Sequence, residues 1–238
     1  MDASGNRQSL KLISLFWFHN IRRPSIVLLM KIRQPVFLLV LALIMVYATF
    51  NAPGSNTENF ALIQRMYSSE FRSVNPLTFS VFNLLGVWPM VYAVLVLEEA
   101  ESQTFPVWPF ILLSFFMGGF IYLVYFGLRK PSHVLRPQTK LQKRVETRKN
   151  MILLSLVGLL LVLYGLVYGD WSGYIASFQT NGLVHIMSLD FILISLLFPM
   201  LVKDDMIRRD NYNTLDWVVY SFIPVLSALY YLNRRLDK

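Results

Sequence analysis

The sequence predicts an all-α protein, a polytopic transmembrane helical bundle with five or six spans. The chain has 238 residues, of which 55% are hydrophobic and only 15% are charged, whereas about a quarter of an ordinary soluble domain is charged. Six apolar stretches make up about half of the chain, and the segments between them have at most 25 residues. Segments this short do not build a core of their own, so no separate soluble catalytic domain is expected.

Length and charge define the spans. A helix needs about 20 apolar residues to cross a bilayer, because it rises about 1.5 Å per residue. Three stretches reach this length without any charged residue, and a fourth contains only His185 and Asp190. The first and the last are short, although Trp217, Tyr230 and Tyr231 in the last suit the membrane interface. In chain order the predicted spans are 35–50, 76–97, 105–128, 151–169, 183–202 and 217–232.

Residues 1–34 precede the first span as a basic arm, with six Lys or Arg and a single acid, Asp2. This composition is typical of a targeting segment. The alternative is an arm lying on the membrane surface. Residues 35–238 are predicted to form a single transmembrane domain, in which no internal repeat stands out.

The first loop has a local signal of its own. Ser55 and Glu58 have the spacing of a capping box. Apolar residues then recur on one helical face as far as Phe71. The sequence therefore predicts an amphipathic helix of about 15 residues along the membrane.

Basic residues in the loops predict the orientation, because Lys and Arg are enriched on the cytosolic side. The loop 129–150 holds eight of them and 203–216 holds three, whereas 98–104 and 170–182 hold none. If all six segments cross, the two sides carry 13 and nine basic residues; if 35–50 does not cross, they carry 19 and three.

Both arrangements agree on the loops that matter most. They place the basic loops 129–150 and 203–216 on the cytosolic or stromal side. They also place the acidic turn Glu98–Glu101 on the opposite side.

Asp190 is the first candidate for a functional residue, because it lies near the middle of a span. A carboxylate there costs about 2.5–3.5 kcal/mol on insertion scales, so it should face a partner inside the bundle or carry a proton. One interpretation is proton or cation handling. The other is a helix-packing contact, with possible polar partners on other spans: Asn83, Ser114, Tyr164 and Ser221.

His185 lies five residues before Asp190 and projects from a different side of the same helix. It could shuttle protons, ligate the magnesium of a chlorophyll-like pigment or form a hydrogen bond at the membrane boundary. The chain has no cysteine, and its three histidines do not have the spacing of a zinc site. The cofactor is unknown from the sequence.

A loop with three acids resembles the magnesium-diphosphate motif of prenyl-transferring enzymes. Asp204, Asp205 and Asp210 would supply the oxygen ligands that Mg²⁺ prefers. Such enzymes need a second acidic cluster facing the first, and the sequence predicts none on that side. Pairing with Arg208 and Arg209 four residues on would instead support a helix end.

Small residues predict close contacts between helices. Ser114 and Gly118 form a small-xxx-small pair, and Gly165 and Gly169 form a GxxxG pair. The sequence contains no Gly-rich phosphate loop and no Ser/His/Asp arrangement. Whether the protein is an enzyme is therefore uncertain, with the absence of a catalytic arrangement favouring a non-enzyme.

Several strings are similar to motifs in a family of polytopic membrane proteins of cyanobacteria and plastids. The resemblance covers about 75–238, and it implies a thylakoid or inner-membrane location but no mechanism. It also draws attention to Trp88. The strings are Asn75-Pro76, Phe82-Asn83-Leu84-Leu85-Gly86-Val87-Trp88-Pro89, Pro106-Val107-Trp108-Pro109-Phe110, Tyr168-Gly169-Asp170-Trp171, Met187-Ser188-Leu189-Asp190-Phe191 and the segment from Leu197-Phe198-Pro199 to Asp205-Met206.

The leading hypothesis is a non-enzymatic accessory or assembly factor of a thylakoid-type membrane. Its partners would be the lipid bilayer and photosynthetic membrane complexes. One alternative is a small proton- or ion-coupled transporter that uses the carboxylate of Asp190, and another is an intramembrane enzyme on a lipid-like substrate. Nucleic-acid binding is not expected, because the basic residues adjoin apolar spans, where lipid headgroups explain them.

Overall fold

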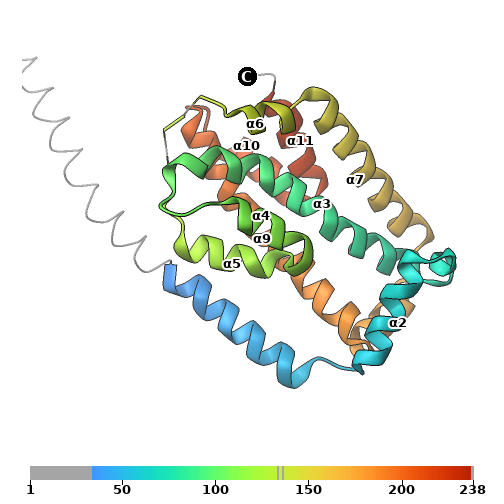
Figure 1. Ribbon diagram of the computed structural model, residues 1–238. Coiled ribbons are helices and arrows are strands. Elements are labelled where there is room, and N and C mark those ends of the chain that lie inside the picture. The colour runs from blue at the N-terminus through green and yellow to red at the C-terminus, as the bar shows by residue number, and fades with distance from the viewer. Residues whose placement is uncertain (1–33, 133, 136, 237–238) are drawn as a thin grey trace, which may run out of the picture.

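The computed structural model describes residues 34–236 except 133 and 136. Within these residues all regular structure is helical, which confirms the all-α prediction (Figure 1). The predicted basic arm lies outside the described residues, apart from its last residue.

Four helices of the described residues are long and apolar enough to cross a membrane. The predicted segments 35–50, 76–97, 151–169 and 183–202 each lie largely within one of them. The centre of the bundle is α3, which packs against both α7 and α9. The first helix, Gln34–Asn51, is the unlabelled blue helix in Figure 1. The other three are α3, Pro76–Glu99; α7, Arg148–Tyr168; and α9, Gly182–Arg208. The 3₁₀ turn η2, Ala100–Ser102, continues α3.

The single helices predicted over 105–128 and 217–232 are wrong, because each segment folds into two short helices. The first pair is α4, Trp108–Met117, and α5, Gly119–Leu128; the second is α10, Thr214–Phe222, and α11, Leu226–Arg235. A ten-residue helix rises only about 15 Å, half of the roughly 30 Å that a span must cover. Gly118 and Val225 interrupt the two segments with φ angles of +53° and +66°.

Both hairpins return to the end of the bundle from which they start. The side-chain amide of Gln103 donates to the carbonyl of Lys130 at 2.9 Å and accepts from its N–H at 2.9 Å. In the second hairpin, the ring of Tyr220 on α10 lies 4.9 Å from that of Tyr231 on α11. The turn Glu98–Glu101 therefore lies at the same end as the loop after α5, and the prediction that it lies opposite was wrong.

Short helices cover both ends of the bundle. At the end opposite the charged turn lie α2, Asn56–Tyr67, the 3₁₀ turn η1, Ser69–Ser73, and α8, Trp171–Thr180. The capping box of Ser55 and Glu58 is confirmed at the start of α2, which has 12 residues. At the other end, α6, Lys140–Val145, precedes α7.

The two halves of the chain repeat one order of elements. The first helix, α2, α3 and the hairpin α4–α5 correspond to α7, α8, α9 and the hairpin α10–α11. The N-caps of α3 and α9, Asn75 and Asn181, are 106 residues apart, and so are the first residues of α4 and α10. Figure 1 shows α3 and α9 side by side, running in the same direction. We conclude that the chain contains a structural repeat.

The sequence hides this repeat. Only eight of the 55 positions in 75–129 are identical to their counterparts in 181–235. No repeat stands out in the sequence, because the halves share the order of their helices and the positions of their acidic pairs and arginines but few other identical residues.

Candidate functional site

The charged end of the bundle is built from two helix ends that carry two acids each. Glu98 and Glu99 lie at the end of α3, and Asp204 and Asp205 lie near the end of α9. Carboxylates are unfavourable beside the negative end of a helix dipole, and all four are buried. The four buried carboxylates therefore require cations close to them.

Arg129, at the end of the first hairpin, supplies one of them. Its guanidinium lies 2.7 Å and 2.9 Å from the two oxygens of Glu99, and 2.5 Å from Asp204 Oδ2. The hydroxyl of Tyr125, one turn earlier on α5, donates to Glu99 at 2.9 Å. Arg129 thus joins the acid of its own half to an acid of the other half.

The second half repeats this pattern 106 residues later. Arg235 contacts Asp205 of its own half at 3.0 Å and Glu98 of the other half. The hydroxyl of Tyr231 donates to Asp205 at 2.5 Å. Glu98, Glu99, Asp204, Asp205, Arg129 and Arg235 are called the charge cluster below. They are joined by Arg208, which donates to Glu99, and Arg209, which donates to Glu98.

Glu146 connects the charge cluster to the corner between α6 and α7. Its carboxylate lies 3.0 Å from Arg235 and accepts a hydrogen bond from Gln138 at 2.8 Å. Burial raises the pKa of Glu146 to about 7, against the lowering effect of Arg209. The corner is therefore tied to the end of α11.

The charge cluster changes the interpretation of the three acids in the last loop. Glu98 and Glu99 do form a second acidic pair that faces Asp204 and Asp205, which sequence reasoning missed by placing them on the opposite side. Guanidinium groups fill the space between the pairs. Asp210 is exposed, and within the described residues no group of three His, Asp or Glu is arranged to hold a metal ion. The arrangement favours the helix-end alternative over a magnesium site.

Asp190 lies at the tip of the first hairpin. Its Oδ1 accepts a hydrogen bond of 2.7 Å from the N–H of Gly119, the first residue of α5. A carboxylate at this place satisfies an N–H that has no partner within the helix and favours the positive end of the helix dipole. This contact favours the helix-packing interpretation of Asp190.

The proposed polar partners of Asp190 divide into two groups. Asn83 and Ser114 line the same pocket of about 260 Å³ as Asp190, although each donates to a backbone carbonyl of its own helix. Tyr164 packs against Phe79, and Ser221 donates to the carbonyl of Trp217. The structure brings the first two near Asp190 and not the last two.

His185 has both ring nitrogens engaged. Nε2 lies 2.9 Å from the hydroxyl of Tyr47, and Nδ1 lies 2.8 Å from the carbonyl of Phe178. The ring also stacks on those of both residues. A histidine held in this way has no free nitrogen for a pigment, so the geometry favours the hydrogen-bonding alternative.

The small residues lie at close contacts. Gly165 on α7 packs against Ser80 of α3, and Gly169 at the end of α7 packs against Leu77. Ser114 donates to the carbonyl of Ile111 and lies 3.1 Å from the hydroxyl of Tyr122, across the hairpin that turns at Gly118.

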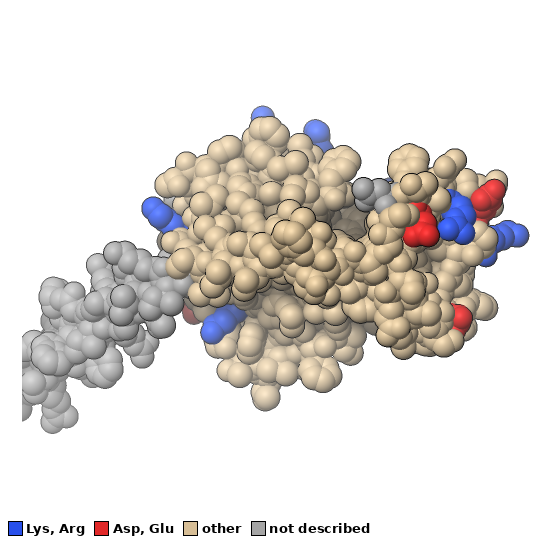
Figure 2. Space-filling view, turned by 90° about the horizontal axis from the view of Figure 1, so that it is seen from below, with Lys and Arg blue, Asp and Glu red and all other residues tan. Residues whose placement is uncertain are grey.

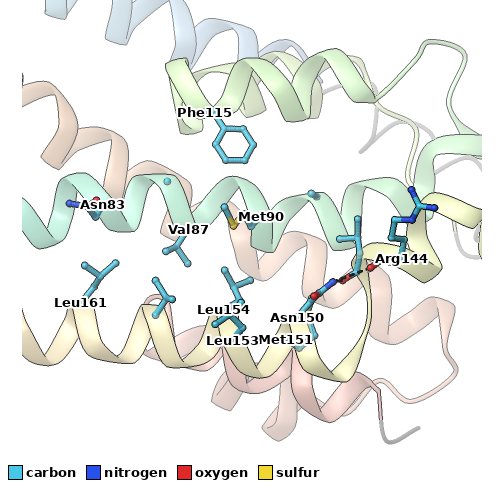
Figure 3. Close-up of a pocket in the computed structure, with 14 residues that line it drawn as sticks. Asn83, Val87, Met90, Phe115, Arg144, Asn150, Met151, Leu153, Leu154 and Leu161 are labelled. Carbon is cyan, nitrogen blue, oxygen red and sulfur yellow. Dashed lines mark hydrogen bonds between the residues drawn. The ribbon is translucent and has the colours of Figure 1, made fainter. Parts of the chain in front are cut away.

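A groove between α3 and α7 holds a cavity of about 850 Å³. Figure 3 shows that the two helices line its length, that Phe115 reaches it from α4, and that Arg144 and Asn150 lie at one end with Asn83 at the other. The remaining lining is apolar or glycine: Gly86, Val87, Met90, Ala93, Val145, Met151, Leu153, Leu154, Val157 and Leu161.

Two local features open the groove. A Cβ atom at Gly86 would meet no other heavy atom within 4 Å, so this glycine leaves free space beside the middle of α3. Asn150 donates to the carbonyls of Arg144 and Val145 at 3.0 Å each, which holds the end of α6 beside the groove. Sequence reasoning missed the groove, although Gly86 inside a span was a visible signal.

The outer surface agrees with a lipid environment. Figure 2 shows the face of the first helix, where charged side chains gather toward the ends and the middle is free of charge. The first helix exposes many apolar side chains, among them Leu39, Leu43 and Phe50.

No protein-family model, curated protein or solved structure matches this chain.

Proposed function

We propose that this chain is an integral membrane protein with four crossings, into which both hairpins dip from the charged end. Exposed apolar side chains on the long helices support this arrangement. The eight basic residues of 129–150 and the three of 203–216 are then on one side with Arg234 and Arg235, whereas the opposite side has Arg65 and Arg72. This asymmetry satisfies the positive-inside rule better than six crossings do.

Single cysteines test the proposed topology, and the chain has no native cysteine to remove. We expect Thr104→Cys to react with a membrane-impermeant thiol reagent from the same side as Lys149→Cys, because both positions are exposed at the charged end. The reference for the opposite side is Gln64→Cys on α2. Labelling of Lys149→Cys from the same side as Gln64→Cys, with Thr104→Cys on the other side, would restore the arrangement in which 105–128 crosses.

We further propose that the bundle binds a lipid-like amphiphile in the groove between α3 and α7. The observation that carries this proposal is an 850 Å³ cavity with an apolar lining and polar residues only at its two ends. An apolar chain in the groove would contact α3 and α7 on opposite sides, and such dispersion contacts are small singly but large in sum. The polar ends would receive the polar part of the molecule.

Filling the groove should expel the bound molecule. We expect Gly86→Leu to lower the amount of co-purified lipid about tenfold, which corresponds to about 1.4 kcal/mol of binding free energy, because Gly86 lines the groove and the new side chain starts in open space there. The measurement is native mass spectrometry after purification in mild detergent. The matched control is Ile192→Phe, since Ile192 is the counterpart of Gly86 on the half-exposed face of α9. Equal lipid retention by Gly86→Leu and wild type would contradict the proposal.

The remaining hypotheses stay predictions. A thylakoid location and an accessory role for photosynthetic complexes rest on the resemblance. Transport through Asp190 rests on its place within α9, and the hydrogen bond to Gly119 gives that residue a structural role. An enzyme acting on a lipid-like substrate would bind that substrate in the same groove.

A further inference from the structure

The groove is polar at the end where α6 meets α7. Arg144 and Asn150 line it there, and within the described residues no ion pair involves Arg144. The surrounding segment carries further exposed basic side chains: Lys140, Lys143, Arg148 and Lys149.

Acidic residues are scarce in the segment 129–150. Glu146 is the single Asp or Glu between 129 and 150. Its carboxylate turns into the bundle, where it contacts Arg235 and Gln138. The mouth of the groove is therefore strongly positive.

The length of the groove matches one leaflet of a bilayer. Its lining residues on α3 run from Asn83 to Ala93, which is about 15 Å at 1.5 Å per residue. The hydrocarbon core of a bilayer is about 30 Å thick. A lipid whose headgroup lies at Arg144 would thus place one leaflet's depth of chain in the groove.

We propose that the groove selects an anionic phospholipid, with its phosphate bound by Arg144 and its chain along α3 and α7. A guanidinium binds phosphate oxygens through two parallel N–H bonds, which a zwitterionic headgroup satisfies less well because its own cation competes. This inference names the ligand class of the site and rests on the lipid-binding function proposed above. It also gives the basic residues of α6 a role in lipid binding, in addition to their effect on the orientation of the chain in the membrane.

The test compares two lipids that differ in their headgroup alone. The full-length protein, delipidated in detergent, is titrated with phosphatidylglycerol and with phosphatidylcholine of identical chains, and bound lipid is counted by native mass spectrometry. We expect wild type to prefer phosphatidylglycerol by about tenfold and Arg144→Gln to lose that preference. Arg234→Gln is the matched control, because Arg234 is exposed at the same end of the bundle outside the groove.

Each outcome has a distinct meaning. Binding of both lipids with equal affinity overturns the headgroup inference and leaves lipid binding intact. Equal losses in Arg144→Gln and Arg234→Gln also overturn it, because they indicate general surface charge. Displacement of the lipid by millimolar inorganic phosphate would show that the anion alone is recognised and would overturn the role of the chain. Failure of wild type to bind either lipid would refute the lipid-binding function itself.

Discussion

Replacement of Arg129 by Met is expected to lower the free energy of unfolding by about 3–5 kcal/mol. The substitution keeps an apolar side chain over Phe126, whose ring lies 4.4 Å from the guanidinium carbon. It leaves Asp204 buried without its arginine, and it leaves Glu99 with Arg208 as its remaining ion-pair partner among the described residues. The cost of an uncompensated buried carboxylate is much larger than that of a lost surface ion pair.

Unfolding of the purified protein by increasing SDS in mixed micelles measures this difference. Arg234→Met is the matched control, because Arg234 is exposed beside Arg235 and should change stability by less than about 0.5 kcal/mol. Adding Asp204→Asn to Arg129→Met should restore part of the loss, since it removes the carboxylate that has lost its arginine. A difference below 1 kcal/mol between Arg129→Met and Arg234→Met would show that the charge cluster is solvated rather than buried.

Replacement of Gly118 by Ala is expected to have the second large effect on stability. The backbone at Gly118, with φ +53° and ψ −132°, lies in a region that costs other residues about 1–3 kcal/mol. A methyl group there would also overlap the carboxylate of Asp190. We therefore expect a loss greater than the backbone cost alone, together with weaker anchoring of the hairpin tip.

Gly86→Ala is the control for this substitution, because the added methyl group meets no neighbour and removes the entropic cost of a helical glycine. It should be neutral or stabilising by up to about 1 kcal/mol. Adding Asp190→Ala to Gly118→Ala should cost less than the two single changes together, since the overlap disappears. Additive losses would show that Asp190 does not contact the hairpin tip.

Composition and hydropathy were enough to predict an all-α chain and the four long apolar helices of its described residues. They failed at 105–128 and 217–232, because the short helices of these hairpins are as apolar as a crossing helix. The break depends on the backbone at Gly118 and Val225, and hydropathy carries no information about it. The loop charges did not correct this error, because they favoured the arrangement in which 35–50 does not cross, and that segment is one of the long apolar helices of the described residues.

The charge cluster had a sequence signal that could have been used. Glu99 and Arg129 are 30 residues apart, and so are Asp205 and Arg235. Each arginine also follows a tyrosine by four residues. The groove had a weaker sequence signal, because the cavity depends on which helices lie beside Gly86, and one sequence does not show how the helices pack.

The repeat makes this chain equivalent to a dimer whose two subunits have been joined. The contacts of Arg129 with Asp204 and of Arg235 with Glu98 would be intersubunit contacts in such a dimer. A symmetric dimer must use the same side chains twice, but a fused one can change each copy separately. Along the groove the first copy has Gly86 and Ala93, whereas the second copy has Ile192 and Pro199 at the corresponding positions. Joining the halves in one chain thus lets one copy have an open groove while both copies have the charges that hold them together.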